Sequence, residues 1–200
     1  MQTFLSRLRG RLQAFQGGGN PRVAVVGGGI GSIEIAFCLD QRMKTNPASL
    51  GLESGKQCEI SLITGGDRVG AGLLESTREK VEAHFQRRGI DFTTGSRVAE
   101  ITPSGLVLKN GVKKEADIVI WATSAVAPPI LESLGLESDE RGFVLTKSTL
   151  QSISSDQIFA VGDSGTIRNS TLVKAGVFAV RQGPVLWDNL RRLLENRKLV

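Results

Sequence analysis

The sequence contains the stretch Val23-Ala-Val-Val-Gly-Gly-Gly-Ile-Gly-Ser-Ile-Glu-Ile-Ala36, in which a short apolar run leads directly into glycines and then into helical spacing. The apolar run is typical of a buried parallel strand, and the residues after the glycines favour a helix. Gly27 permits a tight turn out of the strand, and Gly29 lets a phosphate approach the backbone without a Cβ in the way. A helix that begins here offers free N–H groups and the positive end of its dipole to an anion. The stretch therefore predicts a site for the pyrophosphate of a dinucleotide.

The third small-residue position of this pattern is a serine instead of a glycine. Serine is small enough to let the helix pack against the strand, and the glycine before it adds freedom. The alternative interpretation is a glycine-rich turn in some other α/β protein. The candidate dinucleotide-binding residues of the loop are Gly27, Gly28, Gly29, Gly31 and Ser32.

Length and composition describe an ordinary globular chain. It has 200 residues, of which 40% are hydrophobic and 22% are charged, enough for a proper core and for one large or two small domains. The longest apolar runs, at 23–26 and 118–122, are far shorter than the roughly 20 residues that span a bilayer. No charged segment followed by an apolar one marks a secretory signal. We expect a cytoplasmic, soluble protein.

The net charge is +5, and the excess positive charge gathers at the two ends of the sequence, at 7–11 and 191–198. These ends carry few aromatic side chains for base stacking, and no helix-turn-helix or zinc pattern accompanies them. Nucleic acid is therefore not expected as a partner. A solvated face is the simplest interpretation, and a weak, peripheral contact with an anionic membrane surface is the alternative.

The two cysteines, Cys38 and Cys58, form no C-x-x-C pair, so a disulfide-exchanging site within this chain is not expected. Cys38, four residues after Glu34 on the predicted helix, is expected to be a small buried residue. His84 is the only histidine and is expected at the surface, so the sequence predicts no metal site.

Periodicity and turn residues divide the rest of the chain. The first 15 residues have the spacing of a short amphipathic helix, and Asn110-Gly111 is a hairpin turn signal. The region up to 122 therefore reads as a helix followed by a strand, helix, strand, helix and strand meander that closes on a final strand. The predicted strands are 22–26, 59–64, 91–93, 97–102, 106–109 and 116–122, and the predicted helices are 30–43 and 73–88.

Beyond Pro128-Pro129 the pattern changes. Strands are predicted at 143–145 and 158–161, and a long helix at 172–194 is expected to be interrupted at Gly183-Pro184. We expect an N-terminal helix and linker at 1–20, a nucleotide-binding domain at 21–127 and a smaller part at 128–200. The fold class is α/β, a Rossmann-like domain whose central parallel sheet carries a β-meander.

Four segments, in this order and spacing, resemble the two-dinucleotide-binding-domain flavoproteins of the pyridine nucleotide–disulfide oxidoreductase superfamily. They are Val25-Val-Gly-Gly-Gly-Ile-Gly-Ser-Ile-Glu34, Ile118-Val-Ile-Trp-Ala-Thr-Ser124, Ile158-Phe-Ala-Val-Gly-Asp163 and Lys174-Ala-Gly-Val-Phe-Ala-Val-Arg-Gln-Gly183. The segments are similar to the NAD(P)H loop, the strand that crosses under the cofactor, the flavin motif and the turn before the last helix of that superfamily.

The branch without redox thiols fits best: the type II NADH dehydrogenases and their relatives, including the flavoprotein half of proteins fused to selenide, water dikinase. The resemblance implies an FAD-dependent NAD(P)H oxidoreductase that passes hydride from NAD(P)H to flavin. It leaves the electron acceptor open, with a quinone as one candidate, and it is compatible with a homo-oligomer. The alternative is a non-catalytic nucleotide-binding module of a larger protein or of a selenium-metabolism fusion.

The resemblance also implies roles for single residues. Thr123 and Ser124 would let a flat cofactor lie close to the backbone, with an ordinary strand end as the alternative. Asp163 after Gly162 would accept hydrogen bonds from the ribityl chain, with an N-cap of the next turn as the alternative or as a second role. A helix N-terminus at the Lys174–Gly176 turn, which includes Ala175, would stabilise the negative charge of reduced flavin. Glu34, one turn past the glycines, could reach the nicotinamide end as a catalytic residue, although an exposed helical glutamate is an equal alternative.

Two departures from the family pattern matter. An acidic residue about 20 residues past the glycines often holds the ribose 2′-OH, but the second strand ends at Thr64. Arg68 could pair with a 2′-phosphate and Asp67 could hold the diol, so the choice between NADH and NADPH stays open. The family's first glycine loop, for the ADP half of FAD, has no counterpart before Val23. We expect the nucleotide domain plus the C-terminal part of an FAD domain, with an incomplete flavin site.

Overall fold

A computed structural model describes residues 2–15, 19–53, 56–170 and 174–200 of the chain. It divides into two compact units, 1–123 and 124–200. The boundary predicted from the sequence lies between 127 and 128. Within the described residues, no helix is both long enough and apolar enough to cross a membrane.

The first unit is built on a parallel sheet of four strands in the order β3-β2-β1-β7. Its central strand β1 pairs with β2 on one side and with β7 on the other, with Val23 opposite both Ile60 and Ile118. This arrangement is half of a doubly wound sheet, as the glycine loop predicts. The strands are β1 (Arg22–Val26), β2 (Glu59–Ile63), β3 (Asp91–Thr93) and β7 (Ile118–Trp121).

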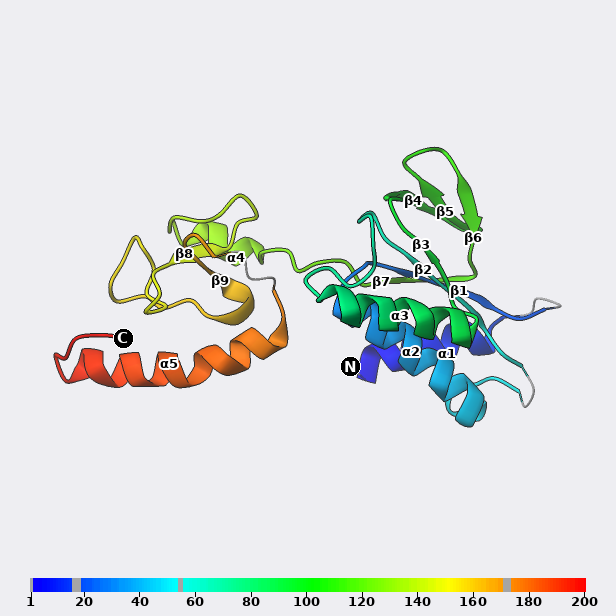
Figure 1. Ribbon diagram of the computed structural model, residues 1–200, viewed down its shortest axis with the longest axis horizontal. Coiled ribbons are helices and arrows are strands. Elements are labelled where there is room, and N and C mark those ends of the chain that lie inside the picture. The colour runs from blue at the N-terminus through cyan, green and yellow to red at the C-terminus, as the bar shows by residue number, and fades with distance from the viewer. Residues whose placement is uncertain (1, 16–18, 54–55, 171–173) are drawn as a thin grey trace. The chain divides into compact units, whose positions relative to one another are not determined.

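The parallel sheet lies between helices on one face and an antiparallel meander on the other (Figure 1). Val23 and Val25 pack into the core beneath the helices, whereas Ala24 and Val26 face an antiparallel meander on the other side of the sheet. The helices are α1 (Gln2–Gln13), α2 (Ile30–Thr45) and α3 (Glu75–Arg88), with a short 3-10 turn η1 (Pro47–Leu50) after α2. The meander strands are β4 (Val98–Thr102), β5 (Gly105–Leu108) and β6 (Lys113–Glu115). The Rossmann-like α/β fold with a β-meander is thus confirmed.

The second unit is smaller and has less regular structure. Its elements are α4 (Pro129–Ser133), β8 (Val144–Thr146), the 3-10 turn η2 (Gly162–Ser164), β9 (Gly165–Ile167) and α5 (Gly176–Leu194). β8 and β9 form a parallel pair. Phe143 and Val144 are fully buried beside Leu131 and Ala160, and these side chains form its core.

Three local predictions were wrong. The strand predicted at 158–161 is reduced to a single bridge between Phe159 and Gln151, because Gly162 adopts φ +57° and turns the chain into η2. The helix α5 is continuous (Figure 1). It includes Pro184, and Gly183 before it has no Cβ for the proline ring to strike. Residues 171–173, where this helix was predicted to begin, lie outside the described residues.

Cys38 is exposed instead of buried, because α2 turns Leu39 and Ala36 inward.

Candidate functional site

The turn between β1 and α2 requires glycine at its first two positions because of close packing. Gly27 has φ +144°, and a Cβ there would lie 2.1 Å from the carbonyl oxygen of Ala122, just after β7. Its N–H donates to the carbonyl of Ile63 at 2.8 Å. A Cβ on Gly28 would lie 2.2 Å from Oγ1 of Thr64. The turn is therefore wedged between the carboxyl ends of β2 and β7.

The next glycines of the loop face open space. A Cβ on Gly29 or Gly31 would meet no atom within 4 Å. Gly29 is the N-cap of α2, and no side chain caps the helix there. The first turn of α2 contains no acidic residue. Free N–H groups, the positive end of the dipole and the absence of a competing carboxylate in this turn suit an anionic group such as a pyrophosphate.

Ser32 occupies the third small-residue position and is fully buried. Its Oγ donates to the carbonyl of Ala122 at 3.1 Å. The serine therefore ties the first turn of α2 to the end of β7, in addition to allowing close packing of the helix.

Thr64 follows β2 and is buried, with Oγ1 accepting a hydrogen bond from the N–H of Gly66 at 3.1 Å. Together with Gly27, Gly28 and Ser32 it lines the turn at the carboxyl ends of the strands. This is the edge at which ligands bind in open α/β sheets.

Arg68 lies in the same loop but is directed toward α3. Its Nη2 lies 3.0 Å from a carboxylate oxygen of Glu82, and its Nη1 forms an ion pair with Glu75. The hydrogen bonds to Glu82 and then Glu75 raise the pKa of the Arg68 guanidinium. Two carboxylates therefore bind Arg68, the residue that the sequence analysis considered as a partner of a 2′-phosphate.

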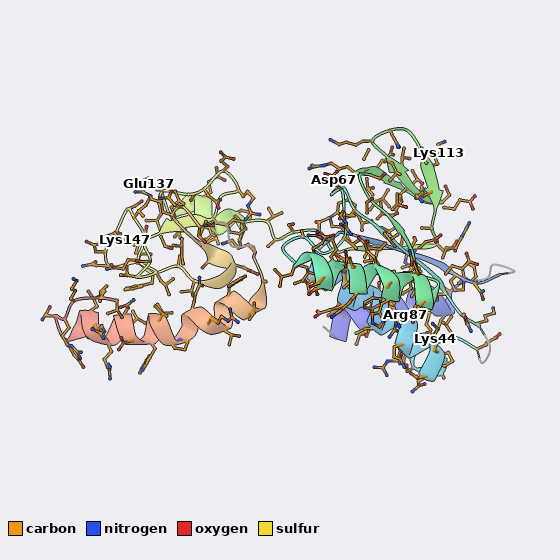
Figure 2. All side chains as sticks on the ribbon, viewed as in Figure 1. Lys44, Asp67, Arg87, Lys113, Glu137 and Lys147 are labelled. Carbon is orange, nitrogen blue, oxygen red and sulfur yellow. The ribbon has the colours of Figure 1, made fainter. Side chains whose placement is uncertain are left out.

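Other predicted site residues lie at the surface. Glu34 is exposed on α2, and Thr123 and Ser124 are exposed after β7. Thr123 ends the first unit and Ser124 begins the second. Asp67 is exposed in the loop after β2, where Figure 2 labels it.

In the second unit, Gly162, Asp163, Lys174 and Ala175 line one small cavity of about 20 Å³. That volume accommodates about one water molecule, so the cavity does not enclose a flavin ring. Asp163 is exposed beside it. Gly176 begins α5, and a Cβ there would meet open space.

Lys174 acts as a structural tie. Its Nζ donates to the carbonyl oxygen of Gly165, lies 3.4 Å from that of Gly162 and sits 4.3 Å from the centre of the Phe143 ring. Burial lowers the pKa of Lys174, and the charge of Asp139 opposes this shift. No sequence pattern marked Phe143 or Asp139 as neighbours of this lysine.

The two cysteines differ in environment, and this predicts a difference in reactivity. Cys38 is exposed, whereas Cys58 lines a cavity of about 640 Å³ at the amino ends of the strands and is half-buried, which raises the pKa of its thiol to about 11. At pH 8 a thiol with this pKa is about 100-fold less ionised than one with a pKa near 9. We expect iodoacetamide to alkylate Cys38 much faster than Cys58, measured by peptide mass spectrometry over time. Equal rates would contradict this.

Among the residues that the structure describes, no group of three or more His, Cys, Asp or Glu side chains is arranged to hold a metal ion.

Comparisons with known proteins identify the family of the chain. Residues 3–183 match the family described as pyridine nucleotide-disulphide oxidoreductase. A type II NADH:quinone oxidoreductase of Haemophilus influenzae is 26% identical over 182 residues, which are 88% of this chain and 41% of the relative. An NADH dehydrogenase-like protein of Mycobacterium tuberculosis is 30% identical over 166 residues, 81% of this chain and 41% of the relative.

Among solved structures, an NAD-dependent persulfide reductase from A. fulgidus superimposes with a TM-score of 0.64 at 25% identity, over 86% of this chain and 31% of the other. The chain thus spans well under half the length of the relatives that it matches. The family match nevertheless extends over most of both units, from α1 into α5. The chain belongs to the pyridine nucleotide-disulphide oxidoreductase family.

Proposed function

We propose that the chain binds NADH or NADPH at the loop 27–32 and presents it for hydride transfer to a flavin, as part of an NAD(P)H oxidoreductase. The observation that carries the proposal is a difference in packing among the loop glycines. Protein atoms pack closely against Gly27 and Gly28, whereas the space beside Gly29 and Gly31 at the N-terminus of α2 is open. Packing does not require glycine at the open positions, but close approach of a ligand does.

Each residue of the loop then has a defined task. The N–H groups at the start of α2 donate to the pyrophosphate, and Ser32 holds that helix in place through Ala122. Glu34 is exposed one turn further along α2, and we propose that it reaches the nicotinamide end. The chain contributes orientation and electrostatics to hydride transfer, because the cofactors carry the reactive atoms.

For the second unit we propose the C-terminal part of an FAD site. Asp163 offers an exposed carboxylate to sugar hydroxyls, and the N-terminus of α5 at Gly176 offers N–H donors with open space before them. Bound FAD supplies the two-electron acceptor for the hydride. Lys174 keeps the 162–165 turn in place through its bonds to the carbonyls of Gly162 and Gly165.

A quinone is the electron acceptor that we propose for the whole protein. The support is that the Haemophilus influenzae relative is named as an NADH:quinone oxidoreductase and another, from Synechocystis, as a demethylphylloquinone reductase. A peripheral membrane location would suit such an acceptor. Exposed apolar side chains on α5, namely Val180, Trp187 and Leu194, and the basic residues near them are compatible with it.

Equilibrium binding tests the proposal. Trp121 ends β7 next to Ala122 and is 54% exposed, so its fluorescence should respond to a dinucleotide bound at the loop. We expect the chain to bind NADH or NADPH with a Kd of about 1 μM to 1 mM and to hold FAD more weakly. Absence of binding of both nucleotides at millimolar concentration would overturn the nucleotide site. FAD that co-purifies in stoichiometric amount would overturn the incomplete flavin site.

A further inference from the structure

The start of the loop after β2, at 64–66, is hydrogen-bonded to the end of β3 and to the segment that follows it. The N–H of Thr64 donates to the carbonyl of Thr93 at 2.9 Å, and the N–H of Ser96 donates to the carbonyl of Thr64 at 2.9 Å. The N–H of Gly95 donates to the carbonyl of Gly66 at 2.8 Å. The residue that follows this paired segment, Arg97, is therefore held beside the carboxyl end of β2.

The side chain of Arg97 lies directly over Gly65. A Cβ on Gly65 would be 2.4 Å from Cγ of Arg97 and 3.3 Å from its Nε. The backbone of Arg97 is anchored as well, since its carbonyl accepts a hydrogen bond from the N–H of Lys109 at 2.7 Å. Only glycine at 65 allows this arginine to lie across the loop.

The charges around this end of the sheet leave Arg97 as the available cation. Arg68 is bound by Glu75 and Glu82, and Glu75 also pairs with Arg78 at 2.5 Å. Within the described residues Arg97 forms no ion pair, and it is exposed to solvent. Its side chain thus lies beside the end of β2, near which dinucleotide folds recognise the 2′ substituent of the adenosine ribose.

The residue that would favour a 2′-hydroxyl is missing from the end of β2. Thr64 stands there, and its Oγ1 is already bonded to the N–H of Gly66. Asp67 is the nearest carboxylate along the loop, three residues further on and exposed (Figure 2). An unpaired arginine at the strand end and a carboxylate only farther along the loop favour an anionic 2′ substituent.

We propose that the nicotinamide cofactor of this chain is the 2′-phosphorylated one, NADPH, and that Arg97 binds its 2′-phosphate. The inference rests on the proposed function, because it assigns the adenosine end of the same dinucleotide site. It differs from the sequence-based hypothesis in the residue that binds the phosphate, since Arg68 is engaged by α3.

The test is a titration of the full chain with NADPH and with NADH separately, followed by fluorescence. Loss of a charge-assisted hydrogen bond costs about 1.5–3 kcal/mol, or roughly 10- to 100-fold in affinity. We expect the wild type to bind NADPH at least about 10-fold more tightly than NADH. Arg97→Ala should weaken NADPH binding by roughly 10- to 100-fold and leave NADH binding unchanged.

Three further variants separate the explanations. Arg87→Ala, in the last turn of α3, makes the same change of net charge away from the site and should alter neither affinity. Arg68→Ala should weaken NADPH binding less than Arg97→Ala does. Asp67→Asn should strengthen NADPH binding modestly, because it removes a carboxylate from the surroundings of the phosphate.

The outcomes of these titrations separate a failure of this inference from a failure of the proposed function. Tighter binding of NADH than of NADPH, with Asp67→Asn weakening NADH, would overturn this inference and leave the proposed function intact. An equal loss of both nucleotides in Arg97→Ala would also overturn it, because the arginine would then act on something common to both. If the wild type bound neither nucleotide, the proposed function would fail, and this inference with it.

Discussion

Replacing Gly29 with valine is expected to abolish dinucleotide binding while the first unit stays folded. Gly29 has φ −81° and ψ 173°, an extended conformation that valine adopts without strain. A Cβ there meets no protein atom within 4 Å, so the substitution disturbs no packing. A branched side chain would instead fill the space in front of the N-terminus of α2. We expect the affinity for NADH and NADPH to fall by roughly 100-fold or more.

Calorimetric titration and thermal unfolding of the same sample check this result. The loss of stability should stay below about 1 kcal/mol, the cost of a poorer N-cap residue. Gly10→Ala is the matched control, because Gly10 lies in α1 and its Cβ would also meet open space. That control should bind as the wild type does. A folded Gly29→Val protein with unchanged affinity would remove the loop as the binding site.

The first unit could be predicted closely because its signals are local. β1 and β3 coincide with the predicted strands at 22–26 and 91–93, and the helices α1, α2 and α3 lie where apolar periodicity and glycines placed them. β6, a three-residue strand rich in charge, carried no apolar pattern, and its pairing with β5 after the Asn110-Gly111 turn creates it. Short strands of this kind depend on their partners more than on their own residues.

The second unit was harder because tertiary context overrides its patterns. The apolar run at 158–161 looks like a strand, but its pairing stops at Phe159 because the chain turns at Gly162. Pro184 looks like a helix break, but the helix continues through it, and the glycine before it removes the contact with a preceding Cβ. The neighbours of these residues, and not the residues alone, decide whether the run at 158–161 pairs as a strand and whether Pro184 ends the helix.

For the candidate site, the sequence indicated the loop and separate roles for Gly27 and Gly29. It did not indicate that Gly28 packs against Thr64 or that Gly27 packs against Ala122, since both contacts come from residues distant in the sequence. One signal was missed: Glu75 and Glu82 are seven residues apart and therefore share a face of α3, where both carboxylates can contact one cation of the preceding loop. Arg97 carried no such signal, because pairing between the loop after β2 and the segment after β3 brings it to Gly65.

Replacing Gly27 with alanine is expected to have the opposite signature to that of Gly29→Val, with a large loss of stability. The added Cβ would lie 2.1 Å from the carbonyl oxygen of Ala122 and 2.6 Å from Oγ of Ser32. Both atoms belong to the joint between β7 and α2, so relief of the clash requires the sheet edge or the helix to move. The φ of +144° adds strain for any residue with a side chain.

Backbone strain of this kind costs about 1–3 kcal/mol, and overpacking costs about the same again. We expect Gly27→Ala to lower the free energy of unfolding by about 3 kcal/mol or more, which corresponds to a fall of roughly 10 °C in Tm. Urea and thermal unfolding measure this, and Gly10→Ala, a helical glycine with open space around it, should instead gain about 0.5–1 kcal/mol. Nucleotide binding by the folded fraction of Gly27→Ala should fall less than in Gly29→Val, so saturating NADPH should recover part of the Tm. A Gly27→Ala protein as stable as the wild type would contradict the close packing of Gly27 against Ala122. Contacts elsewhere would then hold the N-terminus of α2 in place.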